Sequence, residues 1–213
     1  MEGVVQSYLV FLGCYLLGAI PFGYLIGRTM GVDVRNFGSG NIGATNVYRV
    51  LGRVAFLVLA LDVGKGLAAA ALGVRYFPGQ PWLQIGAGFA AVVGHNWPVF
   101  LRFRGGKGVA TTAGVFLYLM PVPLVLAVLA FILTVAASRY VSLGSLVLGT
   151  VVALGSSLIP FPAAYRWAAW VMLLVIIYRH RANIQRLLRG TELRLGQRSQ
   201  SRLRGEGGQV SRD

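Results

Sequence analysis

The sequence is poor in cysteine and in charged residues. Cys14 is the only cysteine among 213 residues, so the chain can form neither an internal disulfide nor a metal site built from several cysteines. Charged residues make up only 12% of the chain, about half the share typical of a soluble domain. Hydrophobic residues account for 56%, and the mean hydropathy is +0.67. Too few polar groups remain to cover a surface that faces water, so most of the surface must face lipid.

Acidic residues are scarce as well. Six Asp and Glu against twenty Lys and Arg give a net charge of +14. In a soluble protein this excess would suggest nucleic acid. Here the basic residues lie between and after apolar runs, where they are topology signals, and no nucleic-acid partner is expected. The first apolar run lacks the basic start and the cleavage site of a secretory signal, so we expect it to be retained.

Six apolar runs predict an all-α, polytopic integral membrane protein of about seven transmembrane helices, because a helix needs about 20 mainly apolar residues to cross the ~30 Å hydrocarbon core. Pro121 and Pro123 divide the longest run into two helices. Five spans also fit, if two of the shorter runs are re-entrant. The runs cover residues 4–26, 54–74, 82–101, 109–138 (two helices), 142–159 and 164–178.

The basic residues predict how the chain is oriented. Seventeen of the twenty Lys and Arg fall in one set of loops and in the C-terminal segment; only Arg75 and Arg166 fall in the other set, and Lys65 lies inside a span. The positive-inside rule then places the N-terminus outside and the C-terminus in the cytoplasm. We expect residues 1–190 to form one membrane-embedded domain. Residues 191–213, rich in Arg, Gln, Ser and Gly, are expected to be a disordered basic tail.

A glycine-rich stretch between the first two runs carries the strongest local motif. Glycines allow backbone N–H groups to converge on an anion. Ser39, Thr45 and Asn46 add short donors, Arg49 adds a permanent charge, and a helix starting near Thr45 would also favour an anion. By composition alone, a flexible loop that joins two helices is the less favoured alternative. Its sequence is Gly38-Ser39-Gly40-Asn41-Ile42-Gly43-Ala44-Thr45-Asn46, followed by Arg49.

A second motif precedes the run that starts at residue 109. A Gly-Gly-Lys-Gly segment that opens a helix combines a permissive backbone, an ammonium group and a helix N-terminus, all suited to phosphate. A basic loop that only anchors the topology is the alternative, and His95 and Trp97 also fit an interfacial aromatic belt. The motif reads His95-Asn96-Trp97-Pro98, then Arg102-Phe103-Arg104-Gly105-Gly106-Lys107-Gly108.

A third motif, residues 178–184, follows the last run. His180 and Asn183 are three residues apart and share a helix face, and histidine suits proton transfer near neutral pH. By itself, the segment also fits a basic flank that ends a span. Arg139 and Ser142 form a smaller polar pair at another cytoplasmic end. The predicted orientation places all these motifs on the cytoplasmic side, which indicates one site for an anionic, phosphorylated substrate.

Asp62 and Lys65 lie inside the second run, away from this group of motifs. Ionisable residues within a membrane are costly and are functional candidates by default. Their i, i+3 spacing also lets the two side chains neutralise each other. The sequence leaves both interpretations open.

Taken together, these residues resemble the bacterial membrane acyl-phosphate:glycerol-3-phosphate acyltransferases (the PlsY family). The resemblance implies transfer of an acyl group from acyl phosphate to the 1-hydroxyl of glycerol 3-phosphate. The products are lysophosphatidic acid and phosphate, formed in phospholipid synthesis at the bacterial cytoplasmic membrane with the active site facing the cytoplasm. Because acyl phosphate is already activated, no cofactor or metal is expected. The matching segments are Gly18–Gly23, Gly38–Arg49, Gly94–Gly108 and His180–Glu192.

The resemblance also assigns residues to the site. It implies catalytic roles for Ser39, Arg49, Lys107, His180 and Asn183. Contacts with substrate or phosphate are expected for Gly38, Gly40, Asn41, Thr45, Asn46, His95, Gly105, Gly106 and Ser142. The acceptor of the hydroxyl proton stays open between His180 and the leaving phosphate. The alternative function is a transporter or channel for an anionic metabolite, which predicts functional polar groups at the bilayer midplane.

Overall fold

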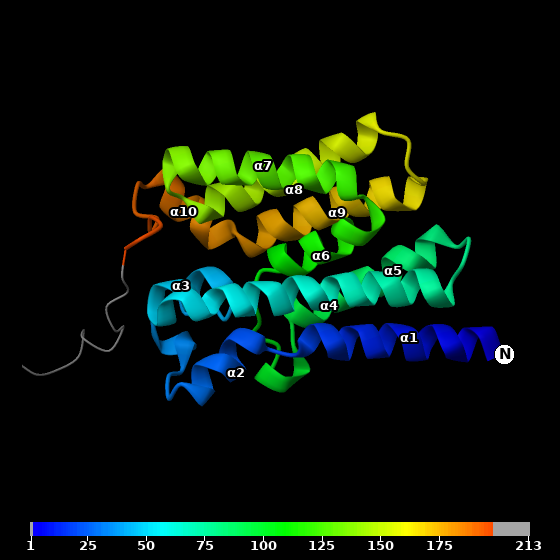
Figure 1. The fold of residues 1–213 in the computed structure, drawn as a ribbon, viewed down its shortest axis with the longest axis horizontal. Helices are drawn as coiled ribbons and strands as arrows, with labels where there is room; N and C mark the ends of the chain where they lie inside the picture. The colour runs from blue at the N-terminus through cyan, green and yellow to red at the C-terminus, as the bar shows by residue number, and fades with distance from the viewer. Residues whose placement is uncertain (1, 198–213) are drawn as a thin grey trace, which may run out of the picture.

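The structure, a computed structural model, describes residues 2–197, which form helices joined by short loops and contain no strand. The long helices run side by side along one axis, and a shorter helix, α6 (Val109–Leu119), lies among them (Figure 1). The long helices are α1 (Glu2–Ala19), α4 (Ala55–Tyr76), α5 (Pro81–Asn96), α7 (Pro121–Ser138), α8 (Val141–Leu158) and α9 (Ala163–Arg179).

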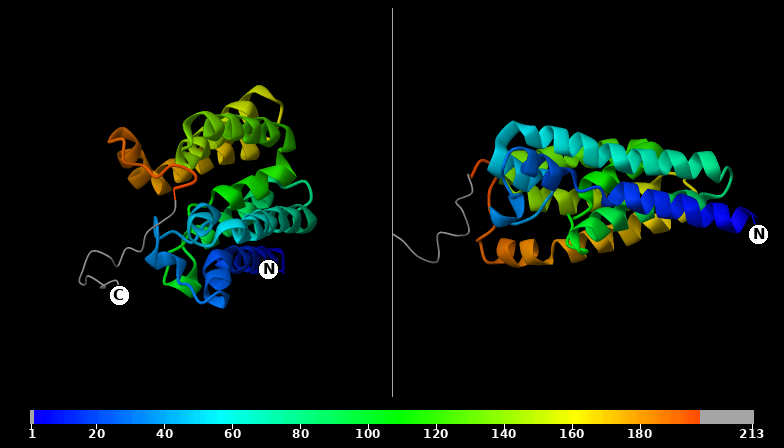
Figure 2. Two further views of the ribbon diagram at one scale, coloured as in Figure 1. Left: turned by 60° about the vertical axis from the view of Figure 1, so that its left-hand side comes forward. Right: turned by 90° about the horizontal axis from the view of Figure 1, so that it is seen from below.

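The short helices gather at the end of the bundle that is opposite the start of α1, as Figure 1 and the right-hand view of Figure 2 show. We call this end the site end. Its helices are α2 (Phe22–Thr29), α3 (Ala44–Leu51) and α10 (Arg181–Leu188). Three single-turn 3₁₀ helices complete the described part of the chain: η1 (Val34–Asn36), η2 (Gly52–Val54) and η3 (Val99–Leu101).

Prolines explain most of the helix boundaries. The first apolar run is two helices rather than one, because Pro21 interrupts it between α1 and α2. The expected break in the run 109–138 is confirmed, since α6 ends at Leu119 and α7 begins with Pro121. α5 ends at Asn96, earlier than expected, because Pro98 disfavours helical geometry at Trp97.

Glycines allow α4 and α6 to pack with their backbones in contact. A Cβ on Gly66 would lie 2.0 Å from the carbonyl oxygen of Thr111, and a Cβ on Gly114 would lie 1.9 Å from that of Val63. Small residues of this kind permit close helix approach where lipid provides no hydrophobic driving force. The close packing fixes the start of α6, and with it the Gly-Gly-Lys-Gly loop, relative to α4.

The apolar surface is that of an integral membrane protein. Along α7, the side chains of Val125, Leu129 and Leu133 are all more than half exposed. Four helical segments are long and apolar enough to cross a membrane: Gly3–Thr29, Ala44–Tyr76, α7 and α8. With 11 residues, α6 is about 16 Å long and cannot cross the ~30 Å core on its own. The count of seven spans and the orientation of the termini stay predictions.

Candidate active site

Lys107 and Asn183, predicted from separate motifs, are in direct contact at the site end. Lys107 Nζ donates to Asn183 Oδ1 at 2.5 Å, which joins the loop before α6 to α10. Asn183 Nδ2 donates to Glu192 Oε1 at 2.6 Å, and Arg186 Nε donates to Glu192 Oε2 at 2.7 Å. Asn183 and Glu192 are buried. Because charged hydrogen bonds are directional, this chain of contacts holds the Lys107 ammonium in a defined place.

The charges around Lys107 suit an anionic ligand. Burial lowers the pKa of Lys107 to about 8, and the surrounding arginines, among them Arg186 and Arg49, act in the same direction while Glu192 opposes them. Burial alone would raise the pKa of Glu192, but hydrogen bonds from Asn183 and Arg186 outweigh burial and hold it below its ordinary value. The site therefore carries several cations for a single carboxylate, a balance that a phosphate would correct.

The Gly-Gly-Lys-Gly loop is held through its backbone carbonyl groups by the Arg179 side chain. Arg179 donates from Nη2 to the carbonyl oxygen of Gly105 and from Nε to that of Gly106, each at 3.1 Å. Gly108 has φ +80°, a conformation that favours glycine, and immediately precedes α6. No side chain in residues 2–197 caps α6, so its first N–H groups are available to an anion.

His180 lies between α9 and α10, as the C-cap of one helix and the N-cap of the other, and its ring is buried. Its Nδ1 lies 2.9 Å from the carbonyl oxygen of Ile176. Because a carbonyl only accepts, Nδ1 carries the proton and Nε2 presents a lone pair. Burial, assisted by the charge of Lys107, lowers the pKa of His180 to about 4. The ring is therefore neutral at physiological pH and can accept a hydrogen bond through Nε2.

The first motif forms a half-buried loop that Asn46 shapes. Asn46 Oδ1 accepts from the backbone N–H of Ser39 at 2.9 Å, and its Nδ2 donates to the carbonyl oxygens of Val34 and Phe37. Asn41 Oδ1 accepts from the N–H of Gly43, the residue before α3. Gly38 and Gly40 have positive φ, and Thr45 lies in the first turn of α3, which confirms the helix expected there. No hydrogen bond among the described residues joins Ser39 to Lys107.

Residues 191–197, the described part of the expected tail, turn back onto the site end; residues 198–213 lie outside the described residues. Arg49 Nη2 donates to the carbonyl oxygen of Leu193 at 3.0 Å. Leu195 forms two hydrogen bonds with Arg139: its N–H donates to the Arg139 carbonyl oxygen at 2.7 Å, and its carbonyl oxygen accepts from Arg139 Nη2 at 3.0 Å. The segment thus connects α3 to the α7–α8 junction, where buried Ser142 lies beside the Glu192 carboxylate.

Three residues of this site were missed from the sequence. Glu192 links Asn183 to Arg186, and Arg179 holds the loop carbonyls. Glu192 is one of only six acidic residues, and this scarcity was the available signal. The two arginines gave none, because basic residues after a span look like a topology flank.

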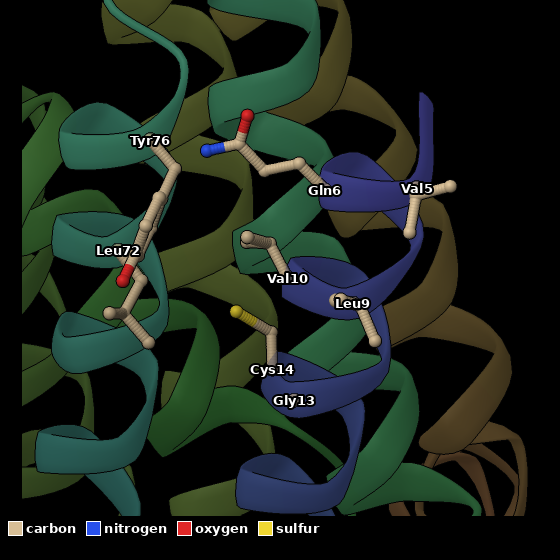
Figure 3. Close-up of a pocket in the computed structure, with 8 residues that line it drawn as sticks. All are labelled: Val5, Gln6, Leu9, Val10, Gly13, Cys14, Leu72 and Tyr76. Atoms are coloured by element: carbon tan, nitrogen blue, oxygen red, sulfur yellow. The ribbon is translucent and has the colours of Figure 1, made fainter. Parts of the chain in front are cut away.

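A hollow on the bundle lies away from these groups. A groove of about 720 Å³ lies between α1 and α4, toward the end where α1 begins. Figure 3 shows the residues that line it. One face is formed by six residues of α1, and the other by two residues of α4. The lining residues are Val5, Gln6, Leu9, Val10, Gly13, Cys14, Leu72 and Tyr76. Its apolar walls contain none of the predicted site residues, so the chemistry lies elsewhere.

The fold and the site together define a helical integral membrane protein with a cluster of cationic side chains at one end of its bundle. The model of the glycerol-3-phosphate acyltransferase family matches residues 8–190. The chain belongs to this family, which confirms the resemblance seen in its motifs.

Relatives and solved structures agree with this assignment. A glycerol-3-phosphate acyltransferase of Halalkalibacterium halodurans is 45% identical over 92% of this chain and 98% of its own length. One of Trichlorobacter lovleyi is 48% identical over 84% and 93%. The crystal structure of PlsY (YgiH), an integral membrane glycerol 3-phosphate acyltransferase, in its glycerol 3-phosphate form matches with a TM-score of 0.86, 41% identity and coverage of 90% of this chain and 96% of that chain. Its lysophosphatidic acid form has a TM-score of 0.84 and 40% identity.

Proposed function

We propose that this chain transfers an acyl group from acyl phosphate to the 1-hydroxyl of glycerol 3-phosphate, at the cytoplasmic face of the bacterial cytoplasmic membrane. The observation that carries the proposal is the contact of Lys107 with Asn183 in a cluster of cations beside His180. Family membership supports the acceptor, because related structures are described in glycerol 3-phosphate and lysophosphatidic acid forms. The acyl phosphate donor comes from the motif resemblance.

The reaction balances without a cofactor. The acceptor hydroxyl oxygen forms a bond to the acyl carbon, and the bond from that carbon to the phosphate oxygen breaks. The hydroxyl proton ends on the phosphate that leaves, so the products are lysophosphatidic acid and inorganic phosphate. The protein must hold two phosphate-bearing substrates in contact and offset their repulsion.

The proposed roles follow from where the cations lie. Lys107 and Arg49 hold phosphate groups, together with the free N–H groups at the start of α6. Asn183 orients the ammonium of Lys107, with Glu192 behind it. Among the expected binding residues, Asn46 shapes the first loop, since all its amide contacts are with loop backbone.

The proton leaves by a substrate-assisted route in this proposal. A pKa of about 4 makes His180 a weak base at neutral pH, where an efficient base has a pKa near the working pH. The second pKa of a phosphate is about 6, so the leaving group is the better acceptor. His180 then accepts a hydrogen bond from the substrate hydroxyl through Nε2 and orients it for attack.

We propose the outside N-terminus and cytoplasmic C-terminus from the Lys and Arg distribution, with seven spans and one acyltransferase domain over residues 1–190. The start of α1 and the helix α10 lie at opposite ends of the bundle, as an odd number of crossings requires (Figure 1). The transporter alternative gains no support, because the predicted site residues cluster at the site end. Asp62 and Lys65, the residues that favoured it, are paired with each other at 2.8 Å.

The test uses purified protein in lipid nanodiscs with palmitoyl phosphate and labelled glycerol 3-phosphate. We expect labelled lysophosphatidic acid, and no comparable product when palmitoyl-CoA or acyl-carrier protein replaces the donor. Lys107→Ala and His180→Ala should cripple turnover without loss of membrane insertion. Folded wild-type protein that makes no product, or that works only with a thioester donor, would overturn the proposal.

A further inference from the structure

A buried ionisable cluster lies where α4 meets α5. Lys65 Nζ is 2.8 Å from Asp62 Oδ1, and His95 Nδ1 is 3.5 Å from the same oxygen. All three side chains are at most 5% exposed. Lys65 also donates to the carbonyl oxygen of Ile20, just after α1, at 3.1 Å. A line of polar contacts thus runs from the end of α1 through α4 to α5.

Mutual neutralisation explains Asp62 and Lys65 but not the third member. A buried ion pair contributes little net stability, and apolar residues of similar size often replace one without loss. Within the membrane, such groups are retained mainly where they serve a function. His95 extends the pair toward the proposed site, because its ring reaches the Gly-Gly-Lys-Gly loop on the side away from Asp62.

The contact between His95 and the loop is close. A Cβ on Gly106 would lie 2.0 Å from His95 Nε2, and the three atoms nearest to that Cβ all belong to the imidazole ring. The N–H of Gly106 also donates to the carbonyl oxygen of His95 at 3.0 Å. Gly106 immediately precedes Lys107, so the position of the His95 ring limits where the lysine backbone can lie.

We propose that Asp62, Lys65 and His95 are positioning residues that brace Gly106 and thereby place Lys107 for phosphate binding. The proposal rests on the function proposed above for Lys107. Lys65 holds Asp62, the Asp62 carboxylate orients the imidazole, and the Nε2 edge of the ring packs against Gly106 of the loop. His95, which the motif assigned to substrate binding, acts in this account through Gly106 rather than by touching phosphate.

A double-mutant cycle tests the contact itself. Gly106→Ala should lower kcat/KM at least tenfold, because the new methyl group collides with the imidazole ring. In a His95→Ala background, the same change should cost less than threefold. Gly105→Ala is the matched control: its Cβ would lie 2.2 Å from the carbonyl oxygen of His95, which His95→Ala retains, so its cost should be the same in both backgrounds. Equal costs of Gly106→Ala in both backgrounds would overturn the brace.

A second measurement does not depend on activity. The chain has only two lysines, Lys65 and Lys107, so the acetylation of Lys107 can be followed cleanly by mass spectrometry. Asp62→Asn and His95→Ala should each raise its acetylation rate at least fivefold by loosening the loop. Tyr165→Phe, which alters a buried polar pair with Gln84 at the opposite end of α5 from His95, should leave the rate unchanged.

The charge-free variant Asp62→Leu/Lys65→Met separates positioning from folding, since it strands neither charge. It should keep the thermal midpoint of the wild type but raise the KM of the same substrate that Gly106→Ala affects, leaving the other substrate's KM within twofold. Unchanged Lys107 acetylation and unchanged KM values in this variant would refute the brace. Failure of the proposed function would appear differently, as wild-type protein that makes no lysophosphatidic acid. The acetylation rates of Lys107 would still test the brace in that case, because they do not depend on activity.

Discussion

The pKa of Lys107 predicts a loss of activity in mildly alkaline solution. With a pKa of about 8, the ammonium is about nine-tenths charged at pH 7 and about one-tenth charged at pH 9. The charged form exists below the pKa, so phosphate binding weakens as the pH rises. Because kcat/KM reports the free enzyme, it should fall about tenfold between pH 7 and pH 9.

The substrates do not produce this decrease. A phosphate with a second pKa of about 6 is already a dianion at pH 7 and gains no further charge up to pH 9. In kcat, the same limb should move to higher pH, because a bound dianion stabilises the ammonium and raises the pKa of Lys107 in the complex.

Lys107→Arg is the control for this assignment. A guanidinium stays charged throughout this range, so the variant should have a lower but flat kcat/KM from pH 7 to pH 9. The assay is initial-rate formation of labelled lysophosphatidic acid with the donor supplied in nanodiscs. A flat wild-type profile, or the same alkaline limb in Lys107→Arg, would refute the assignment of the limb to this residue.

Three further predictions concern the neighbours of Lys107 and the topology. Glu192→Gln removes the negative charge that accepts hydrogen bonds from Asn183 and Arg186. Because a charged hydrogen bond contributes about 1.5–3 kcal/mol, kcat/KM should fall about tenfold to hundredfold. A change within twofold in steady-state rates would contradict this. His180 should stay neutral down to about pH 4, so the only acid limb of kcat/KM near pH 6 should be that of the substrate phosphate, and it should persist in His180→Gln. An acid limb near pH 6.5 that His180→Gln abolishes would show that the pKa of His180 is not depressed. In a Cys14→Ala background, Arg166→Cys should react with an impermeant maleimide on intact cells. Arg189→Cys should react only after the cells are permeabilised. The reverse pattern would show that the proposed orientation is inverted.

Hydropathy and proline predicted the helices well, because both act locally. The break at Pro121 was visible in the sequence, whereas the break at Pro21 was hidden inside a continuous apolar run. The count of spans is harder. The eleven residues of α6 are as apolar as a membrane span but too short to cross the membrane alone, and only the packing of the bundle shows that α6 lies among longer helices.

The site was predictable where each residue type has a chemical reason to be there. Lys107 and Asn183 followed from charge and helix spacing, and their contact bears out the expectation that separate motifs converge. Glu192 was missed because a single acid in a basic, polar segment looks like tail composition. Its role depends on the return of residues 191–197 to the bundle, a long-range fold that no local pattern encodes.

Asp62 and Lys65 also show that local patterns predict local contacts but not long-range ones. Their pairing was readable from the i, i+3 spacing and is present. The third member, His95, is thirty residues or more away along the chain and meets them only because α4 packs against α5. The proposed role of the pair, to position the loop through His95, could therefore be inferred only from the structure.

The most direct test of the account measures both products of one reaction. Purified wild-type protein in nanodiscs receives palmitoyl phosphate and labelled glycerol 3-phosphate, and lysophosphatidic acid and inorganic phosphate are quantified together. The account predicts one phosphate released for each lysophosphatidic acid formed, with both lost in Lys107→Ala. Phosphate release without acylated product, or equal product formation by Lys107→Ala, would contradict it.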